Sequence, residues 1–369
     1  MVRTAIIGLG KMGLSHMSIF SAHPDVEIVA VCDPTKFLVD SLGKFVPVRT
    51  YTDYNKLLKN EVLDAVVVAT PPKFHSEIVG AALQRSLHVF CEKPFCLDPS
   101  EGARLARLAR AKGICHQVGY HFRYVGAFKE ARKLLNAGVI GRIHNIRAEA
   151  YGPVVLRTAG ATWRSHKVEG GGCLYDYASH AIDLMGFLVG PPVEVRGTIL
   201  NTIFSRDVED EVYSMFLYEN GISGQLIANW SDESQRKMSL KVSVWGEKGS
   251  LQADRQEIRI YAREASAVTD HKLNKGWNVK YTTDLTEEVW FYLRGEEYSA
   301  QTSCFISAIT GNSPQTICSN FESAVDTALV TRKLVDDAQG VSAKAPTRRI
   351  KKHHLGLVPG ARFSIRGSE

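Results

Sequence analysis

The chain has 369 residues, of which 44% are hydrophobic and 23% charged, a composition typical of a globular protein with room for two domains. No apolar run reaches the ~18 residues of a membrane-spanning helix, and no secretory signal is apparent, so we expect a cytoplasmic protein with no membrane partner. The net charge of +6 lies entirely in residues 341–369, where seven lysines and arginines face one glutamate. The neutral remainder argues against a nucleic-acid partner, and the segment itself is predicted to be a disordered basic tail.

The first part of the chain alternates short apolar runs with amphipathic stretches. Runs such as Ala65–Ala69 are apolar on both faces, as strands of a parallel sheet covered on both sides require. We therefore predict a doubly wound α/β Rossmann domain over residues 1–122. Its strands are predicted at Thr4–Ile7, Glu27–Cys32, Ala65–Ala69, His88–Phe90 and Cys115–Val118.

After residue 122 strands follow one another without intervening helices, and turn pairs such as Asn220-Gly221 and Lys248-Gly249 separate them. This pattern predicts an α+β domain over residues 123–340, with one large, mostly antiparallel open sheet arranged as a meander. A helix at Leu174–Val189 interrupts the strands, and two helices at Ala300–Thr310 and Glu322–Asp337 close the domain. The predicted strands are Ile143–Ala150, Val193–Ile199, Val212–Leu217, Ser223–Asn229, Leu240–Trp245 and Glu257–Tyr261.

A glycine motif follows the first predicted strand and opens a helix. Gly8, Gly10 and Gly13 match the G-x-G-x-x-G pattern, in which the glycines allow a tight turn, close approach of a pyrophosphate and close helix–strand packing. Asp33 ends the next strand, 20 residues beyond Gly13, where an acidic residue would accept hydrogen bonds from a ribose. A carboxylate there favours NAD. The cation of Lys36 leaves NADP open as an alternative.

Three further segments, taken with the glycine motif, resemble a known family. They are Ala69-Thr70-Pro71-Pro72-Lys73-Phe74-His75, then Cys91-Glu92-Lys93-Pro94, then Gly170-Gly171-Gly172-Cys173-Leu174-Tyr175-Asp176-Tyr177-Ala178-Ser179-His180. Together with the glycine motif they resemble, in order over residues 1 to about 340, the Gfo/Idh/MocA family of glucose–fructose oxidoreductases and inositol dehydrogenases. The chain departs from the family at Ala178, where glycine is usual, and at residues 119–123, which replace the common Asn-His.

The resemblance implies hydride exchange between a nicotinamide and a carbinol carbon, with Lys93, Asp176 and His180 as the catalytic group. His180 is the natural proton carrier because its ordinary pKa of ~6.5 lies near working pH. Lys93 follows a strand at the edge where open α/β sheets bind ligands, so its ammonium can stabilise charge on the reacting oxygen or carry the proton itself. Asp176, four residues before His180, can orient that histidine or bind a substrate hydroxyl.

The remaining site residues are predicted by their place beside these motifs. His75, at a helix start, is more typical of a packing residue than of a reactant. No Cys–His cluster with ligand spacing occurs, so hydride transfer without a metal is expected. We expect the cofactor to contact Gly8, Gly10, Lys11, Met12, Gly13, Asp33, Thr70, Pro71, Pro72, His75, Glu92 and Lys93. We expect the substrate to contact Tyr120, His121, Arg123, Tyr151, Trp163 and Arg164, whose aromatic rings can stack on a sugar and whose arginines can bind an anion.

The leading hypothesis is therefore an NAD(P)-dependent dehydrogenase or ketoreductase acting on a sugar, glycoside, sugar nucleotide or cyclitol. Two alternatives stay open: a dinucleotide-binding sensor without turnover, and the same chemistry on a non-sugar substrate. The resemblance also implies a homodimer or homotetramer, since an open sheet leaves one face to cover. That face is predicted to carry Ser214, Phe216 and Tyr218, or Gln225, Ile227 and Asn229.

Overall fold

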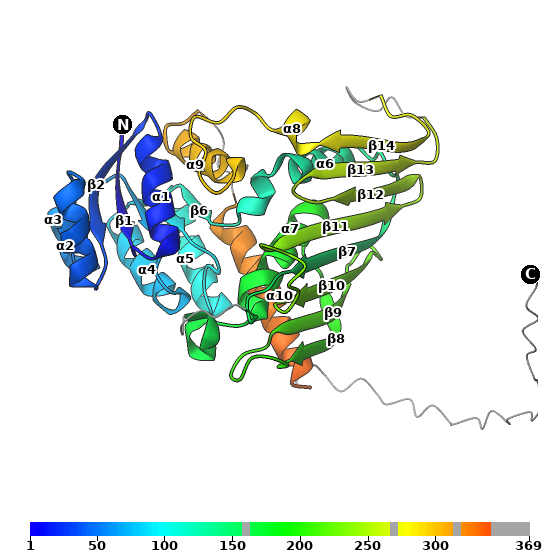
Figure 1. Ribbon diagram of the computed structural model, residues 1–369, viewed down its shortest axis with the longest axis horizontal. Helices are drawn as coiled ribbons and strands as arrows, with labels where there is room; N and C mark the ends of the chain where they lie inside the picture. Colours follow the sequence, from blue (N-terminus) through cyan, green and yellow to red (C-terminus); the bar gives the residue numbers. More distant parts are fainter. Residues whose placement is uncertain (157–162, 266–271, 313–318, 341–369) are drawn as a thin grey trace, which may run out of the picture.

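The computed structural model describes residues 1–156, 163–265, 272–312 and 319–340. The predicted tail at 341–369 lies outside these ranges. Two sheets, each with its own helices, stand beside each other in the described part of the chain (Figure 1). Among the described residues, none of the helices combines the length and the apolar character needed to cross a bilayer.

The first sheet is parallel and has six strands in the order β3-β2-β1-β4-β5-β6. It contains every predicted strand of this region and one that the sequence pattern missed, β3, which is only three residues long. The chain winds outward in both directions from β1 and β4, so the carboxyl ends of these two strands form the switch point where ligands bind. The strands are β1 (Val2–Ile7), β2 (Val26–Cys32), β3 (Arg49–Tyr51), β4 (Ala65–Val68), β5 (His88–Cys91) and β6 (His116–Val118).

Helices cover both faces of this sheet, and two of them come from the end of the chain. Phe305 of α9 contacts Phe20 and Phe90 edge to face, and Phe321 of α10 stacks on Phe95. The core of the first unit is thus completed by segments far away in sequence. The helices are α1 (Lys11–Ala22), α2 (Lys36–Phe45), α3 (Tyr54–Asn60), α4 (His75–Gln84), α5 (Pro99–Ala111), α9 (Glu296–Ile309) and α10 (Phe321–Ala338).

The second sheet has eight strands in the order β14-β13-β12-β11-β7-β10-β9-β8, and only the β7–β10 pair is parallel. The predicted fold class is therefore confirmed, but the predicted meander is wrong in one respect. β7 comes first in sequence and is inserted between β10 and β11, which follow each other in the chain. The strands are β7 (Ile143–Tyr151), β8 (Glu194–Asn201), β9 (Glu211–Leu217), β10 (Ser223–Asn229), β11 (Ser239–Gly246), β12 (Gly249–Ala253), β13 (Glu257–Ala262) and β14 (Gly276–Tyr281).

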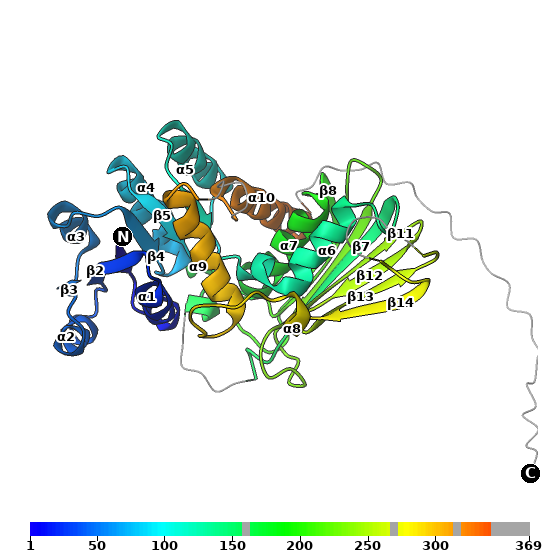
Figure 2. The same ribbon diagram turned by 90° about the horizontal axis from the view of Figure 1, so that it is seen from above.

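Helices α6 (Gly126–Asn136), α7 (Ser179–Val189) and α10 cover the face of this sheet that is turned toward the first unit (Figure 2). The outer face carries Gln225 and Ile227 of β10, as predicted, but the prediction for β9 is wrong. Phe216 is buried and Met215 is 54% exposed. β9 carries apolar side chains on both faces, so its alternation alone could not identify the inner one.

Candidate active site

The glycine turn forms between β1 and α1 as the sequence predicts. Gly8 has a φ of +95°, which favours glycine, and its N–H donates to the Cys32 carbonyl at 2.8 Å. A Cβ on Gly13 would lie 1.8 Å from the Gly8 carbonyl oxygen. The turn and the first turn of α1 are therefore packed against each other more closely than any side chain permits.

Gly10 caps the N-terminus of α1, and a Cβ built on it meets nothing within 4 Å. The helix end therefore faces open space, with Lys11 and Met12 in its first turn and its unpaired N–H groups able to receive a diphosphate. Asp33 stands beside it. Its carboxylate accepts hydrogen bonds from the backbone N–H of Leu9 and of Thr35, both at 2.9 Å, and each oxygen keeps a lone pair for a ribose hydroxyl. These residues fit a dinucleotide.

The loop after β4 adds a wall beside this cradle. The Thr70 hydroxyl oxygen is buried and has no hydrogen-bond partner among the described residues. Pro71 precedes a short 3₁₀ helix at Pro72–Phe74. His75 is fully buried, and its two ring nitrogens lie 2.9 Å from the carbonyl oxygens of Thr70 and Pro94. It joins this loop to the one that carries Lys93, so we assign it a positioning role.

Glu92 lies buried just before Lys93. One carboxylate oxygen is 2.6 Å from His16 Nε2 of α1, and the other accepts the Lys93 backbone N–H at 3.1 Å. Burial opposes ionisation, but the His16 hydrogen bond and the nearby charges hold the pKa of Glu92 below its usual value. A Cβ at Gly119 would lie 2.9 Å from this carboxylate, which explains the glycine there. Glu92 thus ties the Lys93 loop to the cofactor-binding helix.

Lys93, Asp176 and Arg164 form one charged group across the two units. The Lys93 ammonium lies 2.5 Å from one Asp176 carboxylate oxygen and 3.0 Å from the Asp176 carbonyl oxygen. Arg164 Nε donates to the other carboxylate oxygen at 2.8 Å. Although burial opposes it, the two cations lower the pKa of Asp176 to about 2. Within the described residues the ammonium has used two of its three donors, so one remains for a substrate oxygen.

The triple glycine explains how Arg164 reaches this group. A Cβ on Gly171 would lie 2.3 Å from the Arg164 carbonyl oxygen, so the short helix at Trp163–Ser165 packs directly on the glycine backbone. Asp176 then lies on a π-helical turn, Leu174–Ala178, which leads into α7. Among the described contacts Asp176 pairs with Lys93 and Arg164, not with His180.

His180 is buried in the first turn of α7, among aromatic rings. Its ring centroid lies 4.9 Å from that of His121, 5.2 Å from that of Phe122 and 5.8 Å from that of Tyr120. Burial, followed by the charges of Lys93, His121 and Arg164, lowers the pKa of His180 well below its usual value. Its Nδ1 is buried without a partner in the described chain. The ring is therefore a neutral imidazole at pH 7.

Of the other predicted substrate residues, some lie near Lys93 and His180 and some lie away from them. Trp163 lies beside Arg164, whose guanidinium is 4.9 Å from the indole centroid. Arg123 instead makes a bidentate ion pair with Asp183, on the side of α7 that lines an open cavity of about 210 Å³. Tyr151 ends β7, and its hydroxyl donates to Glu149 at 3.1 Å.

The start of α9 brings further residues to this centre that no sequence pattern indicated. The Tyr298 ring stacks on His121 with centroids 4.6 Å apart, and Arg294 lies 5.5 Å from the Tyr298 centroid. Arg255 follows β12 and pairs with Glu297 of α9. Burial and then Arg255 lower the pKa of His121 to about 3. No motif surrounds these residues in the sequence.

The comparisons with known proteins agree with this geometry. Residues 2–120 match the oxidoreductase family with an NAD-binding Rossmann fold, and residues 128–252 match the C-terminal domain of the same family. The chain is 30% identical over 272 residues to a putative UDP-kanosamine synthase oxidoreductase subunit of Amycolatopsis mediterranei, covering 68% of this chain and 74% of that protein. The chain belongs to the Gfo/Idh/MocA oxidoreductase family.

Membership in this family confirms the predicted resemblance and makes the first unit an NAD-binding domain. A second relative, the scyllo-inositol 2-dehydrogenase (NAD(+)) of Bacillus subtilis, is 26% identical over 257 residues, covering 68% of this chain and 73% of that protein. Among solved structures, levoglucosan dehydrogenase in complex with NADH superposes with a TM-score of 0.80 at 23% identity, covering 92% of this chain and 97% of that one. At that identity the likeness concerns the fold.

Proposed function

We propose that this Gfo/Idh/MocA protein transfers a hydride between NAD and a secondary alcohol or ketone carbon of a sugar, glycoside, sugar nucleotide or cyclitol. The observation that supports it most is the pairing of the Lys93 ammonium with Asp176 at the carboxyl edge of the Rossmann sheet, near enough to the neutral His180 imidazole for the Lys93 charge to lower the pKa of that ring. The two relatives, a scyllo-inositol 2-dehydrogenase and a putative UDP-kanosamine synthase oxidoreductase subunit, support a carbohydrate substrate.

The two side chains have complementary tasks. NAD, when bound, supplies the acceptor for the hydride. The remaining donor of Lys93 can hold the reacting hydroxyl and stabilise negative charge as it develops on that oxygen. The neutral ring of His180 can take the hydroxyl proton, and the protonated ring returns it in the reverse direction. Asp176 holds Lys93 in place, and since its carboxylate stays ionised, it compensates the ammonium at every working pH.

The cofactor preference follows from Asp33. Its carboxylate stands at the ribose position already fixed by two backbone N–H groups, so a 2′-phosphate would meet a negative charge. We therefore assign NAD as the cofactor over NADP.

Replacement of the two catalytic residues tests the proposal. We expect Lys93→Ala and His180→Ala each to lower kcat by about 10²- to 10⁴-fold, the range for loss of general acid–base or oxyanion stabilisation. Affinity for NAD, measured by fluorescence titration, should stay within a few-fold of wild type. Full turnover in both variants would contradict the assignment. NAD binding without turnover of any carbinol by the wild type would favour the sensor alternative.

We further propose that the outer face of the large sheet joins two copies into a homodimer or part of a homotetramer. Met215 is 54% exposed and Trp277 is 51% exposed on this sheet, a high exposure for side chains of this size. Sedimentation should give at least twice the mass of one chain, and Met215→Glu should shift the mass toward the single chain. A monomeric wild type would exclude this interface.

A further inference from the structure

Both arginines that the sequence analysis proposed as anion binders already have carboxylate partners. Arg123 donates to Asp183 through two nitrogens, at 2.7 and 2.5 Å. Arg164 donates to Asp176 at 2.8 Å. The charge of Arg123 is therefore compensated inside the protein, and Arg164 shares its carboxylate partner with Lys93.

Arg294 differs from both. None of the ion pairs between described residues includes it, and its Nε is buried without a hydrogen-bond partner there. Its guanidinium stands 5.5 Å from the Tyr298 ring centroid. Its backbone has a φ of +71°, a conformation uncommon for a residue with a side chain.

The surroundings of Arg294 connect it to the reacting centre. Tyr298 bridges Arg294 and His121, since its ring also stacks on the His121 ring at an interplanar angle of 19°. His121 in turn contacts the ring of His180 edge to face, with centroids 4.9 Å apart. Arg294 therefore lies two side chains away from the proposed proton acceptor.

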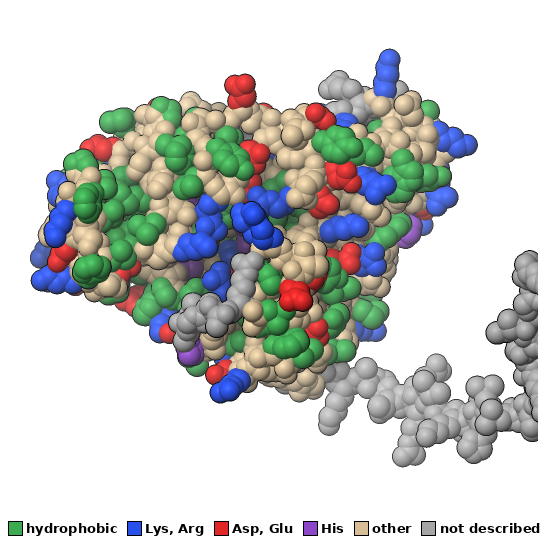
Figure 3. Space-filling model, in the orientation of Figure 1, with side chains coloured by type: hydrophobic (Ala, Val, Ile, Leu, Met, Phe, Trp, Pro, Cys, Tyr) green, Lys and Arg blue, Asp and Glu red, His purple; other side chains and the backbone are tan. Residues whose placement is uncertain are grey.

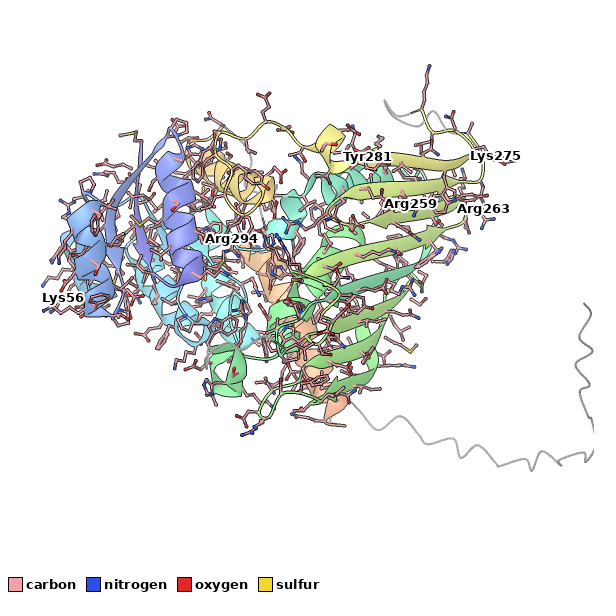
Figure 4. All side chains as sticks on the ribbon, in the orientation of Figure 1. Lys56, Arg259, Arg263, Lys275, Tyr281 and Arg294 are labelled. Atoms are coloured by element: carbon pink, nitrogen blue, oxygen red, sulfur yellow. The ribbon has the colours of Figure 1, made fainter. Side chains whose placement is uncertain are left out.

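The charges around the hollow between the two units also favour an anion beside Arg294. Arg255 faces Glu297, and Lys93 with Arg164 shares Asp176, whereas no described carboxylate pairs with Arg294. Figure 3 shows lysine and arginine side chains around the hollow between the two units, and Figure 4 places Arg294 beside this hollow, across the molecule from Arg263 on the large sheet. The excess positive charge beside His180 would attract an anion.

We propose that Arg294 binds an anionic group of the substrate, a carboxylate or a phosphate, and so selects acidic or phosphorylated sugars over neutral ones. The Tyr298 ring lies beside the guanidinium, with its centroid 5.5 Å away. The inference rests on the proposed function, because it places the anion in the cleft where the carbinol would react. The diphosphate of the cofactor has its own cradle at Gly10 and the N-terminus of α1.

Calorimetric binding to the NAD-loaded protein tests this inference without requiring turnover. The probes are inorganic phosphate, D-glucuronate and neutral D-glucose, so that the first two distinguish phosphate from carboxylate. We expect one of the two anions to bind the wild type at least tenfold more tightly than it binds Arg294→Asn, since the variant loses the charge-assisted hydrogen bonds of the guanidinium. D-glucose should show no such difference.

Two further variants serve as controls. Arg263→Asn removes the same charge from the exposed end of the large sheet and should bind the anion as the wild type does. Arg294→Lys keeps the charge without the planar fork and should lose only part of the affinity. Asparagine tolerates a positive φ, so Arg294→Asn should keep the melting temperature of the wild type.

Several outcomes would overturn the inference. These are binding of neither anion to the wild type, equal binding by Arg294→Asn, and a parallel loss of NAD affinity, which would reassign Arg294 to the cofactor. If the protein bound the anion through Arg294 but oxidised no carbinol, the proposed function would be contradicted and the anion site would be supported. If Arg294→Asn turned over anionic substrates as fast as the wild type does, the anion site would be contradicted and the proposed function would not.

Discussion

At the scale of single residues, burial decides the chemistry of the site. The His180 imidazole is surrounded by three aromatic rings and two cations, so its neutral form is favoured, and a neutral imidazole is the form that can accept a proton. Asp176 is equally buried, but its two cationic partners keep it ionised. Asp176 and His180 lie a helical turn apart, and their different contacts keep the first ionised and the second neutral.

The charge state of His180 predicts a pH profile. The lowered pKa means that the ring loses its proton below pH 6.5, so kcat/KM for alcohol oxidation should stay level from neutral pH to below 6.5 and fall only as the ring becomes protonated. Arg164→Gln removes one of the cations that lower this pKa, so the acidic limb should move upward. An apparent pKa at or above 6.5 for the acidic fall of kcat/KM in the wild type would contradict this explanation. A downward shift of that pKa in Arg164→Gln would contradict it as well.

At the scale of elements, the residues that lie within local motifs were predictable from the sequence. The glycine turn, the Lys93 loop and the triple glycine combine short-range steric demands with a strand or helix boundary, and the structure places each of them where the pattern indicates. β3, β12 and β14 were missed. β3 has three residues and β12 has only Leu251 as a large apolar side chain, whereas β14 alternates Trp277, Val279 and Tyr281 with polar residues, so the period-2 pattern of a strand is present there.

The contacts between distant segments were not predictable. The pairing of Arg123 with Asp183 and of Arg164 with Asp176 depends on how η2 (His121–Tyr124) and the Trp163–Ser165 turn pack on α7 and the π-helical turn before it. The position of Arg294 depends on the return of α9 to the first unit, more than 270 residues after α1 begins. Such contacts arise from tertiary packing, which a single sequence does not show.

The glycine turn gives a prediction with an internal control. In Gly10→Ala the new methyl group points into the open cradle and the φ of −64° suits alanine, so we expect an unchanged melting temperature and at least a tenfold loss of NAD affinity. In Gly13→Ala the methyl group collides with the Gly8 carbonyl, so the melting temperature itself should fall. Thermal melts with and without NAD would separate the loss of NAD affinity from the loss of stability. Equal melting temperatures for the two variants would contradict the close packing at Gly13.

At the scale of the whole molecule, the site is assembled by both units. Lys93 comes from the Rossmann sheet, Asp176 and His180 come from the helical layer of the large sheet, and α9 brings Tyr298 from near the end of the chain. The first unit is the NAD-binding domain, and we propose that the second supplies the proton acceptor, His180. Neither unit alone contains both the ammonium and the imidazole.

The stoichiometry of the reaction tests the central claim most directly. Purified protein is given NAD and a panel of neutral, acidic and phosphorylated sugars and cyclitols, and nicotinamide absorbance is followed together with the mass of the product. We predict that one NADH forms for each substrate molecule that loses two hydrogens, and that His180→Ala lowers the rates of both signals by the same factor. Product formed without net NADH, or NAD bound with every carbinol of the panel unchanged, would contradict it.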